Sequence, residues 1–166
     1  MFVEMKVSGL TIDPLTNTPI VILKDLEGKR AVPIWIGLFE ASAIATELEK
    51  ISFSRPMTHD LIRDLLKILD AKVLKIEIVD LRNNTFFACI HLNRNGDTLI
   101  VDSRPSDAIA LALRVNCPIF IDEKVIEKSR NIDFAKKVDE LDKKKTEELK
   151  EFLENLPEED FGKYKM

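Results

Sequence analysis

The feature that most constrains the fold of this chain is a pattern of three alternating apolar segments and one amphipathic segment, which occurs twice. At an offset of 67 residues, TPIVILKD aligns with TFFACIHL, and RAVPIWIGLFEASAIATEL aligns with DTLIVDSRPSDAIALALRV. Alternation of period two is typical of strands, and apolar residues three and four apart are typical of helices. The sequence therefore predicts an α+β fold of two strand-strand-strand-helix units that form a mixed or antiparallel sheet.

This repeat has two interpretations. The first is an internal duplication, which would give the two helices related starts and places Glu40 and Asp107 in equivalent first turns. The second is that any two three-stranded meanders followed by a helix align about this well, since the identities are few, chiefly Ala41 with Ala108. Both interpretations predict the same order of elements.

The individual elements follow from the same patterns and from turn residues such as LEGK, RNNT and RNGD. The expected strands are Phe2 to Leu10, Pro19 to Asp25, Arg30 to Ile36, Val73 to Leu81, Phe86 to Leu92, Thr98 to Asp102 and Cys117 to Ile121. The expected helices are Leu38 to Lys50, a second from Thr58, a third from Pro105, and Glu123 to Ser129.

The composition shifts near residue 130. Residues 131–166 hold 8 Lys and Arg and 11 Asp and Glu, with apolar residues at roughly helical spacing. We therefore expect a domain over residues 1–130 and a charged amphipathic helical tail over residues 131–166, which packs on the body or on a second copy of it.

Composition excludes several classes of protein. No apolar run approaches the ~20 residues that cross a bilayer, and Glu4 and Lys6 interrupt the stretch that a signal peptide would need. Cys89 and Cys117 form no CxxC pair, so a disulfide framework or a zinc knuckle has no support, and the cytoplasm is the expected compartment. A sequence pI near 5.3 predicts that any phosphate binding is local.

The densest polar cluster is DSRPSDAIALALR, which leads from a strand into a helix. It gathers carboxylates, hydroxyls and a guanidinium at a helix N-terminus, where free N–H groups and the helix dipole favour anions. The candidate residues are Asp102, Ser103, Arg104, Ser106 and Asp107. A purely structural arrangement explains them too, with a serine as the helix cap, Asp107 as the dipole complement and Arg104 paired with Asp102.

Two further clusters carry candidate chemistry. SFSRPMTHDL offers Arg55, His59 and Asp60 around a proline turn, and a histidine beside an aspartate can act as a base, a metal ligand or a phosphate partner. PIWIGLFEA offers Glu40 after a glycine that permits a tight turn. His91 shares a strand face with Cys89 and is interpreted as structural.

The common catalytic motifs are absent from the sequence. It contains no P-loop, GxGxxG, HExxH or GxSxG and no Cys/His pairing with metal spacing, so no organic cofactor is expected. Acids, one histidine and arginines remain. This combination fits hydrolysis of a phosphodiester with Mg²⁺ or Mn²⁺, and it fits anion binding without chemistry equally well.

Taken together, PIWIG with EASAIA, RPMTHDL, and DSRPSDAIALALR followed by CPIF resemble the bifunctional nuclease domain family over about residues 1–128. The resemblance implies a nuclease that cleaves DNA and RNA, on an α+β fold that assembles as a homodimer. It also implies a C-terminal helical motif like that of excision-repair nuclease subunits, and EELKEFLENLPEEDFGKYKM is similar to the start of such a motif.

Two hypotheses follow. In the first, the chain is a metal-assisted nuclease in which acidic residues bind the metal, His59 acts in acid-base catalysis, and Arg104 and Arg55 grip phosphate with Ser103 and Ser106. The candidate catalytic or metal-binding acids are Glu40, Asp60, Asp102 and Asp107. In the second, it is a non-catalytic dimeric module that binds a nucleotide, a nucleic acid or a protein through its helix starts.

Overall fold

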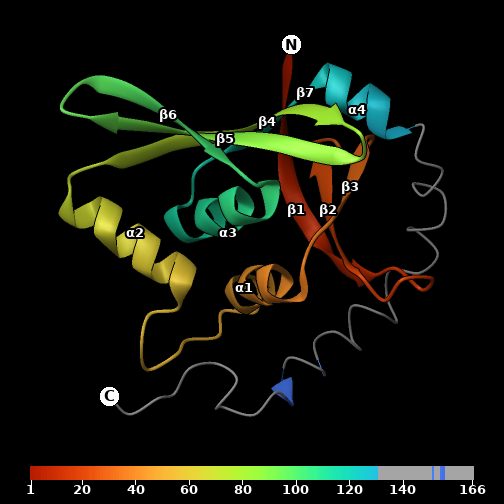
Figure 1. Cartoon of the computed structure of the whole chain (residues 1–166), viewed down its shortest axis with the longest axis horizontal. Coiled ribbons are helices and arrows are strands. Elements are labelled where there is room, and N and C mark those ends of the chain that lie inside the picture. Colours follow the sequence, from red (N-terminus) through yellow and green to blue (C-terminus); the bar gives the residue numbers. More distant parts are fainter. Residues whose placement is uncertain (131–150, 152–153, 156–166) are drawn as a thin grey trace.

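A seven-stranded mixed sheet and four helices make up the part of the chain that the structure, a computed structural model, describes: residues 1–130, 151 and 154–155 (Figure 1). The α+β class is therefore confirmed. The expected helical tail, apart from residues 151 and 154–155, lies outside the described residues.

All the strands and helices that the sequence pattern predicts within residues 1–130 are present, with ends that differ by one or two residues in most cases. The strands are β1 Phe2–Ile12, β2 Pro19–Asp25, β3 Ala31–Trp35, β4 Lys72–Arg82, β5 Thr85–Arg94, β6 Asp97–Ser103 and β7 Ile119–Asp122. The helices are α1 Leu38–Leu48, α2 Thr58–Ile68, α3 Pro105–Val115 and α4 Glu123–Arg130.

The strand order is β3-β2-β1-β7-β4-β5-β6. Each half is an antiparallel meander, and the short β7 joins them by pairing antiparallel with β1 and parallel with β4. The β5–β6 turn uses Asn95 at φ 53° and Gly96 at φ 86°, left-handed conformations that a two-residue hairpin turn requires. The sheet is thus two meanders held at their inner edges by one strand.

Both halves share one hydrophobic core. Helices α1, α2 and α3 lie on the same side of the strands in Figure 1, and α3 contacts α1, α2, β4 and β5. Ile44 of α1, Ile109 of α3 and Ile126 of α4 all belong to the main buried cluster, with Val21 and Ile78 from the two halves of the sheet. Burying these side chains is the main force that sets α1 and α3 side by side.

The repeat predicted from the sequence is visible in the order of elements. Helices α1 and α3 begin at Leu38 and Pro105 and end at Leu48 and Val115, so both bounds differ by the 67 residues of the alignment. Glu40 and Asp107 occupy the two first turns. An origin by duplication stays a prediction.

The outer edge of the second meander is more exposed than its counterpart. In β3 the three central residues are buried, whereas all of β6 except Ser103 is exposed, including Leu99, Ile100 and Val101. Among the described residues, no helix is long and apolar enough to cross a membrane.

Candidate functional site

A pocket of about 650 Å³ lies between α1, α2 and α3. One part of its lining is apolar and the other part is polar. The apolar lining includes Leu38, Phe39, Phe53 and Met57, and the polar lining includes Glu40, His59, Arg104, Asp107 and Arg114. The pocket therefore brings together residues from all three polar clusters of the sequence.

Arg104 connects the starts of α1 and α3. Its Nη1 lies 2.8 Å from Oε1 of Glu40, and its Nη2 lies 2.8 Å from Oδ2 of Asp107. The side chain of Arg104 is 66% exposed, so the guanidinium is open to solvent although it is paired. These two carboxylates raise the pKa of Arg104, first through the hydrogen bond with Asp107. The structure thus pairs Arg104 with these acids, and the expected pairing with Asp102 is wrong.

His59, in the first turn of α2, contacts Asp107 as well. Its Nε2 lies 2.9 Å from Oδ1 of Asp107, so Asp107 bridges His59 and Arg104 through its two oxygens. His59 is buried, while the side chain of Asp107 is 31% exposed. A continuous chain of polar contacts results, running from Glu40 through Arg104 and Asp107 to His59.

The helix starts that place these residues are not capped as the sequence suggested. Arg104, rather than a serine, is the N-cap residue of α3, and no side chain caps that end. At α2 the N-cap residue is Met57 rather than Thr58, and the carboxylate of Asp60 accepts the N–H of Met57 at 3.0 Å. The serine cap expected for α3 is therefore wrong, because Arg104 holds the N-cap position there and Met57 holds the equivalent position at α2.

Gly37 precedes α1 and controls the position of Glu40. A Cβ atom at Gly37 would collide with Oε2 of Glu40, whose side chain folds back over the glycine. Only glycine leaves this space. Gly37 has extended backbone, with φ −71° and ψ 160°, so the glycine is not needed for a tight turn; its use is to leave room for the Glu40 carboxylate to turn toward Arg104.

Arg114 links helices α1, α2 and α3 through hydrogen bonds from its buried side chain. Its side chain is 2% exposed; Nε donates to Oδ1 of Asp60, and two other nitrogens donate to the carbonyl oxygens of Ala110 and Ala43. Burial would raise the pKa of Asp60, but the N–H of Met57 and the charge of Arg114 outweigh it and hold this pKa below its ordinary value. Asp60 therefore lies in a structural ion pair with an arginine that the sequence did not single out.

Four other predicted residues do not line the pocket. Arg55 is exposed in the loop before α2, and Ser106 is buried in the first turn of α3. Ser103 donates its hydroxyl to the carbonyl oxygen of Arg104 at 2.9 Å. Asp102 is paired in register with Cys89 of β5 and is exposed. Because neighbours in register lie on the same face of a sheet, Asp102 is beside Cys89 and apart from Asp107.

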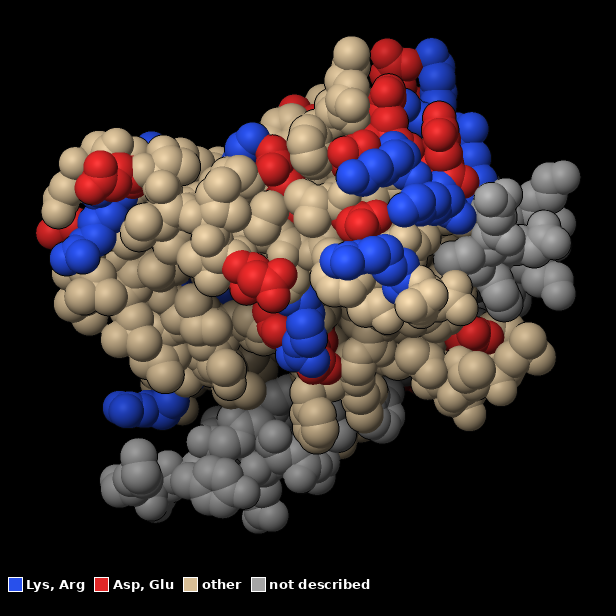
Figure 2. Space-filling model, turned by 45° about the horizontal axis from the view of Figure 1, so that its top comes forward, with Lys and Arg blue, Asp and Glu red and all other residues tan. Residues whose placement is uncertain are grey.

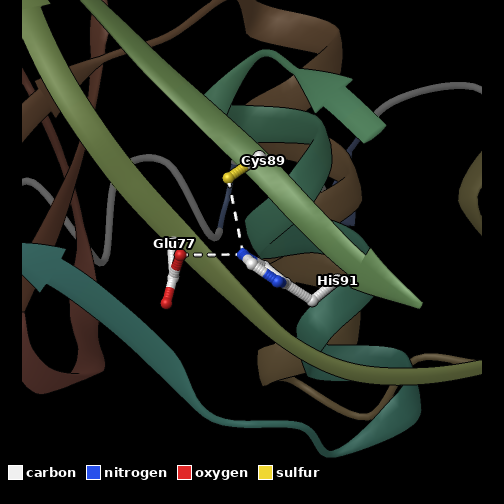
Figure 3. Close-up of side chains that lie close together, drawn as sticks. All are labelled: Glu77, Cys89 and His91. Carbon is white, nitrogen blue, oxygen red and sulfur yellow. Dashed lines mark hydrogen bonds and ion pairs between the residues drawn. The ribbon is translucent and has the colours of Figure 1, made fainter. Parts of the chain in front are cut away.

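A second cluster joins β4 and β5, as Figure 3 shows. Nε2 of His91 lies 2.7 Å from Oε2 of Glu77 and 3.6 Å from Sγ of Cys89. The three offer ligand atoms that all lie within 4.8 Å of one another, which makes them a candidate metal-binding triad. The sequence pattern did not predict this triad, and His91 was expected to be structural. Cys89 and His91 on one strand face were a visible signal, but Glu77 joins them only through the pairing of β4 with β5.

The surface carries no broad basic area on the face that Figure 2 presents, where blue and red side chains lie intermingled. This agrees with the low pI, and it limits phosphate contacts on this face to individual cations.

The bifunctional nuclease domain model matches residues 21–133. Uncharacterized protein MT1877 of Mycobacterium tuberculosis is 38% identical over 167 residues, which cover 95% of this chain and 97% of that protein. Bifunctional nuclease 1 of Oryza sativa subsp. indica is 22% identical over 109 residues, which cover 63% of this chain and 33% of that longer protein. With the helix starts of α1, α2 and α3 all inside the matched region, the chain belongs to the bifunctional nuclease domain family.

Proposed function

We propose that this protein is a nuclease that hydrolyses phosphodiester bonds of DNA and RNA in the pocket between α1, α2 and α3. The observation that carries the proposal is the chain of contacts from Glu40 through Arg104 and Asp107 to His59, inside a pocket with an apolar wall. Family membership supports the same reaction class.

Arg104 supplies the grip on the phosphate. A guanidinium presents parallel N–H donors that match two phosphate oxygens, and the exposure of this side chain lets an incoming phosphate reach it. The start of α3 adds free backbone N–H groups and the positive end of the helix dipole. Glu40 and Asp107 hold the guanidinium at this place until substrate arrives.

His59 is the acid-base group in this proposal. Asp107 accepts a hydrogen bond from Nε2, which leaves Nδ1 as the nitrogen that can take a proton. A carboxylate that orients an imidazole in this way also stabilises the imidazolium that forms. His59 would therefore accept a proton from the attacking water and return one to the leaving oxygen.

The apolar wall suits a nucleobase. Phe39 lies in the first turn of α1 with 84% of its surface exposed, and Phe53 and Met57 line the same pocket. Stacking of a base on an aromatic ring is worth about 1–3 kcal/mol and tolerates any sequence. An apolar wall beside a phosphate grip is the arrangement that a nuclease without sequence preference needs.

A divalent ion, Mg²⁺ or Mn²⁺, completes the proposal. Glu40 and Asp107 are hard oxygen donors that already converge on one positive charge, that of Arg104, and Mg²⁺ is commonly bound by one or two carboxylates together with substrate phosphates. These two residues would hold the ion. When bound, it would neutralise charge on the phosphate and lower the pKa of a water molecule.

A non-catalytic dimeric binding module is the second candidate. It is favoured by one observation, that the acids of the pocket are paired with arginines rather than free. A homodimer is proposed under either function, because β6 is an edge strand with exposed apolar residues, such as Ile100 at 65% exposure. A cytoplasmic location stays a prediction.

Cleavage assays on the full-length protein test the proposal. Single-stranded and duplex DNA and RNA are incubated with Mg²⁺, with Mn²⁺ or with a chelator, and products are resolved by size. Asp107→Ala is prepared identically, and Asp64→Ala serves as its matched control, because Asp64 is a surface acid of α2 that pairs with Arg63 outside the pocket.

We expect metal-dependent cleavage by the unchanged protein and by Asp64→Ala, and its loss in Asp107→Ala. Equal cleavage by all three preparations would reject this pocket as the site of cleavage, whether the activity came from another part of the chain or from a contaminating nuclease. Tight binding of the same substrates without cleavage, weakened by Asp107→Ala, would support the module instead.

A further inference from the structure

We propose that Glu77, Cys89 and His91 form a second metal site, selective for Zn²⁺ or a similar transition-metal ion, on the sheet surface between β4 and β5. This site is separate from the proposed nuclease pocket, whose lining includes none of these three residues. It stands whether or not the chain cleaves nucleic acids.

The distance between Cys89 and His91 fits a tetrahedral ion, and Glu77 reaches such a position by a small shift. With Zn–S near 2.3 Å and Zn–N near 2.0–2.1 Å, a tetrahedral site separates sulfur and nitrogen by about 3.6 Å. Sγ of Cys89 and Nε2 of His91 lie 3.6 Å apart. Oε2 of Glu77 lies 2.7 Å from the same Nε2, a hydrogen-bond distance, and must move outward by about 0.6 Å to reach the spacing of a zinc-bound pair.

The donor types select the metal. A thiolate is a soft ligand and an imidazole a borderline one, and together with one carboxylate they favour Zn²⁺ over Mg²⁺ or Ca²⁺, which prefer all-oxygen sets. Three protein ligands leave a fourth tetrahedral position for water or an exogenous ligand. The geometry is therefore that of an open site rather than of a closed structural one.

The charges balance when the ion binds. When Zn²⁺ binds, the Nε2 proton that His91 donates to Glu77 would move through solvent to Nδ1, so the imidazole ligates in its neutral form. The thiol proton of Cys89 would be released to solvent, and the Glu77 carboxylate and the Cys89 thiolate would neutralise the dication. No oxidant or reductant is needed.

Lys75 does not block the site. Its ammonium contacts Oε1 of Glu77 and lies 5.7 Å from the centre of the Phe120 ring, while Oε2 is the oxygen that faces His91. Glu77 can therefore keep Lys75 on one oxygen and use the other for the ion. Hydrogen bonds that an outer residue of this kind donates to a ligand carboxylate orient the ligand.

Cobalt titration of the full-length protein, first stripped with a chelator, tests the site. Thiolate-bound Co²⁺ gives a sulfur-to-metal charge-transfer band in the near ultraviolet, which the thiol-free pocket lining cannot produce. Added Zn²⁺ should abolish the band at one equivalent and raise the melting temperature. Cys89→Ser and His91→Gln are compared with Cys117→Ser, which removes the other thiol of the chain.

We expect a saturable band in the unchanged protein and in Cys117→Ser. We expect its loss in Cys89→Ser, and affinity at least a hundredfold lower in His91→Gln. Circular dichroism verifies that each variant is folded. A band that survives Cys89→Ser, one that disappears with Cys117→Ser, or no saturable binding at micromolar metal would overturn the proposal. Asp107→Asn should leave the cobalt spectrum unchanged, so failure here is distinct from failure of the nuclease assignment.

Discussion

The two ends of helix α3 each carry an arginine that joins a carboxylate from another helix, yet the two arginines differ in their surroundings. Arg104, at the start, is 66% exposed and binds Glu40 of α1, whereas Arg114, in the last turn, is 2% exposed and binds Asp60 of α2. Arg114 also donates to two backbone carbonyl oxygens, which satisfies donors that water cannot reach. The same residue type therefore has a structural role at one end and is available to a ligand at the other.

The difference shows how burial assigns a role to an ion pair. An exposed pair contributes about 0–1 kcal/mol to stability and can exchange its partner, because water competes with every contact. Removing one member of a buried pair leaves an uncompensated charge in the interior. Perturbing the two ends of α3 separately should therefore separate folding from activity.

The largest effect is expected from Arg114→Ala. This change leaves Asp60 without its buried partner and opens space between three helices, so we expect the free energy of unfolding to fall by about 3–5 kcal/mol. Urea denaturation followed by circular dichroism measures it. Arg63→Ala is the control, since Arg63 is a partly exposed arginine of α2 that should cost less than about 1 kcal/mol. A loss below 1 kcal/mol for Arg114→Ala would remove the contrast between the two ends.

Asp107→Asn should have the next largest effect, on activity. The amide keeps the size of the side chain but loses the charge that orients His59 and holds Arg104, so cleavage should fall by about a hundredfold, the order seen when one major electrostatic group is removed. Single-turnover cleavage rates measure it, with Asp64→Asn as the matched variant. Unchanged metal-dependent cleavage by folded Asp107→Asn would exclude this end of α3 as the reaction site.

Arg104→Lys should give a smaller loss, of about tenfold, because a lysine makes one of the two charge-assisted hydrogen bonds that a guanidinium makes, and such a bond contributes about 1.5 kcal/mol or more. Stability should stay unchanged. Substrate affinity and melting temperature are measured together, with Arg82→Lys, an exposed arginine of β4, as the control. A fall in melting temperature for Arg104→Lys without loss of affinity would assign a structural role to this end too.

The smallest effect is expected on the stability of the protein at acidic pH. Because the folded-state pKa of Asp60 is lowered, its contribution to stability is present above its unfolded pKa near 4 and is lost as the pH falls through the folded value. The stability difference between the unchanged protein and Asp60→Asn should therefore shrink below pH 4, with a slope of at most about 1.4 kcal/mol per pH unit. This difference is measured by urea denaturation of both proteins at intervals of about half a pH unit, from about pH 2.5 to about pH 7. A constant difference across this range would contradict the assignment.

The order of elements could be predicted from the sequence because it depends on local rules. The same holds for the polar clusters at the starts of α1, α2 and α3. Period-two alternation located the strands, and Pro105 marked the start of α3. The convergence of Glu40, His59 and Asp107 was not visible as geometry, since it depends on how the core sets α1 and α2 against α3. Only the resemblance to a family grouped these residues in advance.

The positions of several side chains could not be predicted from the sequence, because they depend on strand register and on burial. Asp102 and Asp107 are five positions apart, but the strand register places Asp102 beside Cys89 on the sheet. Arg114 lies in the last turn of α3, and its burial follows only from the packing of three helices. Glu77 and Cys89 are partners across β4 and β5. Their pairing could not be predicted from simple alternation, because two irregularities in β4 shift the register.

The position of β7 has a consequence for the synthesis of this protein. The strand that joins the two meanders is the last one of the described sheet to be made, because Ile119–Asp122 follows all six others in the chain. Until it emerges from the ribosome, the inner edges of β1 and β4 have no partner, and unpaired edges are where chains associate wrongly. A chain that ends before residue 119 would hold two meanders with nothing between them, so translation must pass this point before the body of the protein can close.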